Sequence, residues 1–109
     1  ALEGAPGHAH WKALCAADGQ PGAAAGLFSI LLRPQYTQAQ VDRFCDALQL
    51  FKLGYSWGGP ISLVVPYELE TMRQQWPQGL ERGTLVRFSV GLESVDDLWA
   101  DLQQALAQM

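Results

Sequence analysis

Two segments with strand-like patterns predict the centre of a β-sheet. Residues 26–33 read G-L-F-S-I-L-L-R, with Phe28 on one face, and Pro34 ends the strand because it has no N–H for a neighbour. Residues 85–90 read L-V-R-F-S-V, and their alternation places Phe88 on an apolar face. Both strands are therefore expected to present one apolar face to a core.

Shorter and less regular segments lie between these two strands. Strands are expected over 50–53 and over 61–65, with Pro66 closing the second. Between them the chain reads Y-S-W-G-G-P, which predicts a loop. The stretch 67–83 is expected to be mostly loop, with room for one short helix, because Pro and Gly interrupt its pattern.

Two amphipathic helices are expected to pack on the sheet. The first begins at Thr37, which has capping-box spacing with Gln40. Its apolar stripe is Val41, Phe44, Cys45 and Leu48. The second begins at Ser94, a favourable N-cap residue. Its expected buried stripe is Val95, Leu98, Trp99, Leu102, Ala105 and Leu106. Its acidic residues are interpreted as capping or solvent-facing residues: Asp96, Asp97 and Asp101.

The expected order of elements is therefore β-α-β-β-β-α. This order indicates an α+β fold with a small, mainly antiparallel sheet and both helices on one face. The helices are expected to cover the face that carries Phe28 and Phe88. The opposite face, which carries Arg87, is expected to stay partly open.

The first 25 residues differ in character from the rest of the chain. Residues 1–25 are rich in Ala, Gly and Pro and show little periodicity apart from a possible helical turn near 10–14, where Trp11 is interpreted as a packing residue. We interpret 1–25 as a connector from a missing upstream domain. Residues 26–109 are interpreted as one small α+β domain, which suits a chain of 109 residues.

Composition excludes several classes of function. The net charge is −4 and the seven basic residues are scattered, which disfavours nucleic-acid binding. The apolar runs are too short to span a bilayer, no signal peptide is visible, and the two widely spaced cysteines favour a reducing, cytoplasmic setting. Cys45 is expected to be a buried free thiol rather than half of a disulfide with Cys15. His8 and His10 have no further ligands nearby, so no metal site is expected.

Two features are candidates for chemistry. Arg87 lies in the middle of a predicted strand, and a guanidinium offers two parallel donors to a carboxylate at any working pH. The alternative is an arginine exposed on a solvated sheet face. In Y-S-W-G-G, the paired glycines allow close approach of a ligand, while Ser56 and Trp57 offer polar donors. The alternative is a simple turn in which Trp57 fills a gap.

Groups that would perform catalysis themselves are missing. Two scattered histidines do not support a Ser-His-Asp or Cys-His arrangement, and no Gly-rich strand-to-helix turn cradles a phosphate. The only lysines, Lys12 and Lys52, lie in no suggestive motif. We therefore expect a surface that binds a substrate and no catalytic residue in this chain.

The order and spacing of the motifs resemble a known family. F-K-L-G-Y-S-W-G-G-P-I-S-L (51–63) and G-T-L-V-R-F-S-V-G-L-E-S-V-D-D-L (83–98) resemble the C-terminal domain of pyridoxal 5′-phosphate (PLP) enzymes of cysteine and methionine metabolism, of fold type I. P-G-H-x-x-W-K (6–12) and G-L-F-S (26–29) fit the same pattern. S-W-G-G, with Trp57 where other branches have leucine, is similar to the cystathionine β-lyase branch. That branch converts L-cystathionine to homocysteine, pyruvate and ammonia by α,β-elimination.

The resemblance implies specific roles. Arg87 matches the arginine that binds the substrate's α-carboxylate, and Ser56 and Trp57 match a loop that lines the substrate site, with Tyr55 as a weaker candidate. The family's catalytic lysine, phosphate-binding turn and pyridine-nitrogen aspartate lie in an upstream PLP-binding domain. The resemblance therefore implies a fragment that is inactive and binds no PLP alone, taken from an enzyme that forms dimers and tetramers.

Two alternatives stay open. The chain could be a free-standing module that senses an amino acid by binding its carboxylate to Arg87. It could also belong to a cystathionine γ-lyase or γ-synthase type of relative, although Trp57 argues against that branch.

Overall fold

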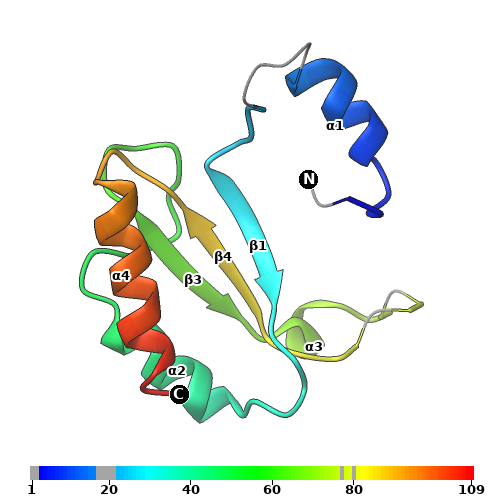
Figure 1. Cartoon of the computed structure of the whole chain (residues 1–109). Helices are drawn as coiled ribbons and strands as arrows, with labels where there is room; N and C mark the ends of the chain where they lie inside the picture. The colour runs from blue at the N-terminus through cyan, green and yellow to red at the C-terminus, as the bar shows by residue number, and fades with distance from the viewer. Residues whose placement is uncertain (1–2, 17–21, 77, 80) are drawn as a thin grey trace.

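A computed structural model describes residues 3–16, 22–76, 78–79 and 81–109 and shows an α+β fold (Figure 1). The strands are β1 (Leu27–Leu31), β2 (Lys52–Leu53), β3 (Leu63–Tyr67) and β4 (Leu85–Ser89). The helices are α1 (His8–Cys15), α2 (Gln38–Ala47), α3 (Leu69–Met72) and α4 (Val95–Leu106). The expected β-α-β-β-β-α order is confirmed, with α1 and α3 added to it.

The four strands form one mainly antiparallel sheet in the order β1-β4-β3-β2. β4 pairs antiparallel with both β1 and β3, and the short β2 pairs parallel with β3. Helices α2 and α4 lie side by side on one face, over β3 and β4 (Figure 1). The register sets Arg87 of β4 between Ser29 of β1 and Val65 of β3, on the face away from these helices.

The core lies between the sheet and the two helices. The predicted stripe of α2 is buried throughout, and the capping box at Thr37 and Gln40 is confirmed. Phe88 is 3% exposed and meets the rings of Phe44 and Phe51 edge to face. Cys45 belongs to this core, where burial, together with nearby carboxylates, raises the pKa of its thiol to about 11.

The predicted buried stripe of α4 is wrong for half of its members. Val95, Trp99 and Leu106 are 78%, 61% and 51% exposed. The helix instead buries a stripe rotated by part of a turn, on which Leu98, Asp101 and Ala105 lie at i, i+3 and i+7. The interpretation of Asp101 as a solvent-facing residue is therefore wrong. A carboxylate takes the buried position because backbone N–H groups of the neighbouring chain need an acceptor there.

The predicted end of β3 at Pro66 is also wrong, since the strand runs from Leu63 to Tyr67. β2 pairs only with Leu63 and Val64, so β3 is an edge strand at Pro66. A residue without an N–H is tolerated there because no neighbouring strand needs its donor. Ile61 lies before the strand and is 56% exposed.

The helices cover the face of the sheet incompletely. Phe28 of β1 stacks on Phe88 but remains 46% exposed, so the expectation that α2 and α4 cover both residues holds only for Phe88. Helix α1 is longer than the expected turn, and none of its residues is buried. Its Trp11 donates its indole N–H to the carbonyl of Ala23 at 2.8 Å, so it packs within the predicted connector. Residues 17–21 of that connector lie outside the described residues.

Two kinds of feature are absent from the described part of the chain. None of its helices has the length and apolar character needed to cross a membrane. Its His, Cys, Asp and Glu side chains form no group of three or more that could bind a metal ion.

Candidate functional site

The segment 54–62, which we call the tryptophan loop, crosses the face of the sheet opposite α2 and α4. It leaves β2 with the N–H of Gly54 bonded to the carbonyl of Val64 at 3.2 Å. Farther along, the N–H of Gly58 donates to Oγ of Ser89 on β4 at 3.1 Å. The loop therefore covers part of the Arg87 face. Ser89, which the loop contacts through Gly58, and Val65 are both buried and share that face with Arg87.

Arg87 lies directly beside the start of this loop. Its Nη2 donates to the backbone carbonyl of Tyr55 at 2.6 Å, and its guanidinium carbon lies 5.7 Å from the ring centroid of Tyr67. The rings of Tyr55 and Tyr67 meet edge to face at 6.4 Å. The carbonyl of Tyr55 and the ring of Tyr67 thus restrict the orientation of the guanidinium plane.

The charge of Arg87 has no acidic partner among the described residues, where the one ion pair is Arg82 with Glu70. A guanidinium has five N–H donors, and the bond to Tyr55 uses one of them. The side chain is also only half-buried. The arrangement therefore offers an oriented, accessible cation with spare donors, which is the chemistry that binds a carboxylate.

Ser56 and Trp57 follow Tyr55 and are exposed, Trp57 by 62%. Trp57 lines a groove of about 450 Å³ together with Gly58, Gly59 and the adjoining ends of β1 and β4. Arg87 is not among the residues that line this groove. The structure thus places Tyr55 against Arg87 through its backbone, and Trp57 toward the start of β1.

Asp101 of α4 fixes the chain just before the loop, and the sequence interpretation missed this role. Its two carboxylate oxygens accept the backbone N–H groups of Gln49, Leu50 and Phe51 at 2.8, 2.7 and 3.3 Å. Burial pushes the pKa of Asp101 upward, but these bonds and one from Gln104 outweigh it and hold the pKa below its usual value. The sequence did contain a signal for this role. Asp101 is an acidic residue that lies three residues after Leu98, on the apolar stripe of the helix.

Tyr67 was missed because the strand was expected to end at Pro66. Tyr67 is two residues beyond Val65, so an extended strand places both on the face of Arg87. The sequence analysis also assigned no role to Glu93. Glu93 binds Ser62 at the other end of the tryptophan loop through two hydrogen bonds.

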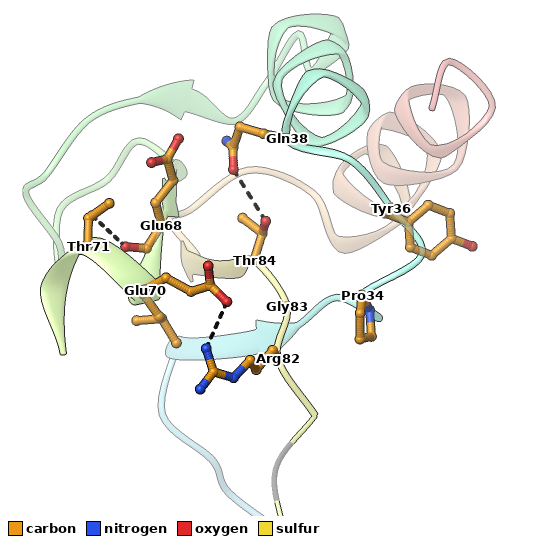
Figure 2. A pocket seen from close by; sticks show the side chains of 10 residues that line it. Pro34, Tyr36, Gln38, Glu68, Glu70, Thr71, Arg82, Gly83 and Thr84 are labelled. Atoms are coloured by element: carbon orange, nitrogen blue, oxygen red, sulfur yellow. Dashed lines mark hydrogen bonds and ion pairs between the residues drawn. The ribbon is translucent and has the colours of Figure 1, made fainter. Parts of the chain in front are cut away.

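A second pocket lies at the opposite end of the sheet, beside Gly83 and Thr84, and has a volume of about 380 Å³ (Figure 2). Its polar side chains bond to one another: Arg82 pairs with Glu70 at 3.3 Å, and Thr84 donates to Gln38 at 3.3 Å. Figure 2 shows these pairs spanning the pocket. Because its one lining cation, Arg82, is already paired with Glu70, we do not regard this pocket as the functional site.

The residues present do not fit a complete PLP site on this chain. Attachment of PLP requires a lysine amine at the site. The ammonium group of Lys52 donates to the carbonyl of Gln49 at 2.6 Å, and Lys12 lies on the exposed helix α1. Neither lysine lines the groove at Trp57. The candidate site is therefore the surface built on Arg87 and the tryptophan loop, which offers a cation and no cofactor-binding lysine.

The chain is similar in sequence and in fold to known PLP-dependent enzymes. Cystathionine beta-lyase of Salmonella typhimurium is 40% identical over 111 aligned residues, which cover all of this chain and 27% of the relative. The chain thus spans about a quarter of the length of that relative.

Two solved structures match nearly the whole chain. Apo CalE6, a methionine gamma lyase from Micromonospora echinospora, aligns with a TM-score of 0.64 and 38% identity, over 97% of this chain and 26% of the other. Cystathionine gamma synthase from Xanthomonas oryzae pv. oryzae, in complex with cystathionine, aligns with a TM-score of 0.65 and 33% identity, over 98% and 27%. The expected fold class, the small α+β domain of a fold type I PLP enzyme, is confirmed. Residues 1–107 match the family described as Cys/Met metabolism PLP-dependent enzyme, and the chain belongs to that family.

Proposed function

We propose that this chain is the C-terminal, substrate-carboxylate-binding domain of a PLP-dependent cystathionine β-lyase. The observation that carries the proposal is the oriented and acid-free guanidinium of Arg87 beside the tryptophan loop. The 40% identity to a cystathionine beta-lyase over the whole chain supports the choice of enzyme. The reaction is α,β-elimination of L-cystathionine to homocysteine, pyruvate and ammonia.

Arg87 is proposed to bind the α-carboxylate of the substrate through two parallel N–H donors. Tyr55 accepts one N–H through its carbonyl, and Tyr67 lies against the guanidinium, so the fork is held in place before substrate arrives. A fixed carboxylate sets the direction of the Cα–H bond that must be broken. Orientation of this kind accounts for a large share of the rate enhancement in many enzymes.

Ser56 and Trp57 are proposed to line the remainder of the substrate site, with Tyr55 contributing to its edge. Their exposure leaves their polar groups accessible to a ligand. Trp57 borders the groove of about 450 Å³, which offers a surface to the part of the substrate beyond the carboxylate.

Catalysis itself is assigned to an upstream PLP-binding domain, and the chain alone is proposed to be inactive. When bound, PLP stabilises the negative charge that develops on the substrate carbon. The contribution of this chain is to bind and orient the amino acid. We expect the complete enzyme to be a cytoplasmic homo-oligomer that neither binds nucleic acid nor crosses a membrane.

A second candidate is a related enzyme that eliminates at the γ-carbon or exchanges a γ-substituent. The matches to a methionine gamma lyase and to a cystathionine gamma synthase favour it, since both cover nearly the whole chain. A free-standing amino-acid sensor is the remaining alternative. It requires this chain alone to bind a free amino acid, which isothermal titration calorimetry would detect.

The test uses the full-length enzyme with L-cystathionine. The β-lyase assignment predicts pyruvate, whereas γ-elimination releases 2-oxobutyrate, and the two acids are separable by chromatography. Replacing Arg87 with Ala should lower kcat/KM by on the order of 10²-fold or more, because the carboxylate is no longer oriented. Arg43→Ala on α2 is the matched control, since Arg43 is an exposed arginine on the helix layer. Near-normal kinetics of Arg87→Ala would remove the carboxylate role.

A further inference from the structure

Glu93 lies at the base of the tryptophan loop and binds both donors of one buried residue. Ser62 is fully buried, and its backbone N–H donates to Oε1 of Glu93 at 2.8 Å. The hydroxyl of Ser62 donates to Oε2 of Glu93 at 2.7 Å. The same hydroxyl oxygen accepts the N–H of Gly91 at 2.8 Å, which closes a small network between the loop and the β4–α4 turn.

The two backbone segments of this network approach each other unusually closely. The N–H of Leu92 donates to the carbonyl of Pro60 at 2.9 Å. A Cβ at Gly91 would lie 2.3 Å from that same carbonyl oxygen and 2.8 Å from Oε2 of Glu93. Glycine is therefore required at 91, and the carboxylate of Glu93 occupies a space shaped by the surrounding backbone.

The network joins the substrate-facing loop to a rigid element. Glu93 immediately precedes Ser94, the N-cap of α4, whose hydroxyl accepts the N–H of Asp97. Asp101 of the same helix binds the backbone before β2, on the other side of the loop. Asp101 of α4 and Glu93 just before the helix thus fix both ends of the segment that carries Ser56 and Trp57.

We propose that Glu93 is a positioning residue, which fixes the end of the tryptophan loop through Ser62 so that Ser56 and Trp57 face the substrate bound at Arg87. This inference rests on the proposed function. Glu93 itself does not touch the substrate and acts only through the loop. Hydrogen bonds from the backbone and hydroxyl of Ser62 lower the pKa of Glu93, so the carboxylate stays charged and its bonds are charge-assisted at neutral pH.

The test compares Glu93→Ala, Glu93→Gln and Asp96→Asn in the full-length enzyme. Asp96 is an exposed acid three residues along the chain and serves as the matched control. Glu93→Ala should lower kcat/KM by on the order of 10-fold to 10²-fold, mainly through KM, because the loop is misplaced while Arg87 is intact. Glu93→Gln, which keeps the shape and one acceptor, should recover part of that loss.

Two further readouts separate positioning from a general loss of stability. Hydrogen exchange followed by mass spectrometry should accelerate in peptides that span 54–62 and stay unchanged in peptides from β4 and α2. In a double-mutant cycle, Ser62→Ala combined with Glu93→Ala should cost no more than the worse single variant, because the two residues act as one unit. If Glu93→Ala yields no soluble enzyme, Glu93→Gln and Ser62→Ala carry the same comparison.

The outcomes distinguish this inference from the proposed function. A wild-type enzyme without carbon–sulfur lyase activity rejects the proposed function, and the loop's hydrogen exchange still tests the network. An active wild type whose Glu93 variants keep kcat/KM and loop exchange overturns the positioning role. Uniform acceleration of exchange across β4, α2 and the loop also overturns it, because that result indicates only a structural role.

Discussion

At the scale of single residues, the site depends on charges that are oriented before any ligand binds. Arg87 has its guanidinium placed by a carbonyl and an aromatic ring. Asp101 has both oxygens engaged by the backbone at 49–51. The two charges differ in how they are satisfied: the cation keeps spare N–H donors, and the buried anion has its oxygens bonded within the chain.

Asp101→Asn should destabilise the 109-residue chain by about 1–3 kcal/mol, because an amide offers one acceptor oxygen where the backbone presents three N–H donors. Urea denaturation at pH 7 measures the free energy of unfolding. Asp96→Asn is the control and should change this free energy by no more than about 0.5 kcal/mol. Equal stability of the two variants would contradict the capping role.

The same carboxylate predicts how stability depends on pH. The pKa of Asp101 is lower in the folded chain than in the unfolded chain, so the unfolded chain binds protons first as the pH falls. Its stabilisation is complete above the unfolded value of about 3.9 and is lost as the pH falls through the folded value. Urea midpoints between pH 6 and pH 3 should therefore fall less in Asp101→Asn than in the parent chain.

Cys45 and Cys15 should differ sharply in reactivity. Burial raises the pKa of the Cys45 thiol to about 11, whereas Cys15 is exposed on α1. Because the thiolate is the reactive form, a thiol reagent at pH 8 should modify Cys15 quickly and Cys45 only after unfolding. Mass spectrometry of the native chain should find one label, at Cys15. Rapid labelling of Cys45 would show that its burial is wrong.

At the scale of elements, the sequence predicts a helix or strand correctly where several local signals indicate the same structure. The helix at Thr37 was predicted correctly because a capping box and an apolar stripe point the same way. The alternation of 85–89 likewise predicted both β4 and the face on which Arg87 lies. These features are local, so the sequence alone specifies them.

Other elements depend on contacts that local patterns do not contain. The apolar surface of α4 is wider than its buried face, and Asp101 decides which part turns inward by bonding to residues about fifty positions away. Pro66 continues β3 because β2 is too short to reach it. Both features need the tertiary arrangement, and so does the placement of Tyr67 beside Arg87.

Gly91→Ala tests the close contact between the tryptophan loop and the β4–α4 turn. The added Cβ would lie 2.3 Å from the carbonyl oxygen of Pro60, so one of the two segments must shift. We expect a loss of about 1–3 kcal/mol in unfolding free energy, measured by urea denaturation. Gly59→Ala is the control for stability, because nothing lies within 4 Å of its Cβ. A neutral Gly91→Ala would contradict the contact.

At the scale of the whole molecule, the two faces of the small sheet are covered to different extents. One face packs on α2 and α4 (Figure 1), and the other carries Arg87 beside the tryptophan loop. Apolar side chains stay exposed on strand β1 and on helix α4, including Phe28 and Trp99. The chain spans about a quarter of the cystathionine beta-lyase that it resembles, and the proposed reaction needs groups beyond the described residues.

The most direct test of the account measures thiol release by the full-length enzyme from two substrates. One is L-cystathionine. The other is an analogue in which an amide replaces the α-carboxylate of the half that becomes pyruvate. Wild type should prefer the carboxylate by on the order of 10²-fold in kcat/KM, and Arg87→Ala should lose most of that preference. If Arg87→Ala discriminates between the two substrates as strongly as wild type does, Arg87 does not bind the carboxylate and the central claim is wrong.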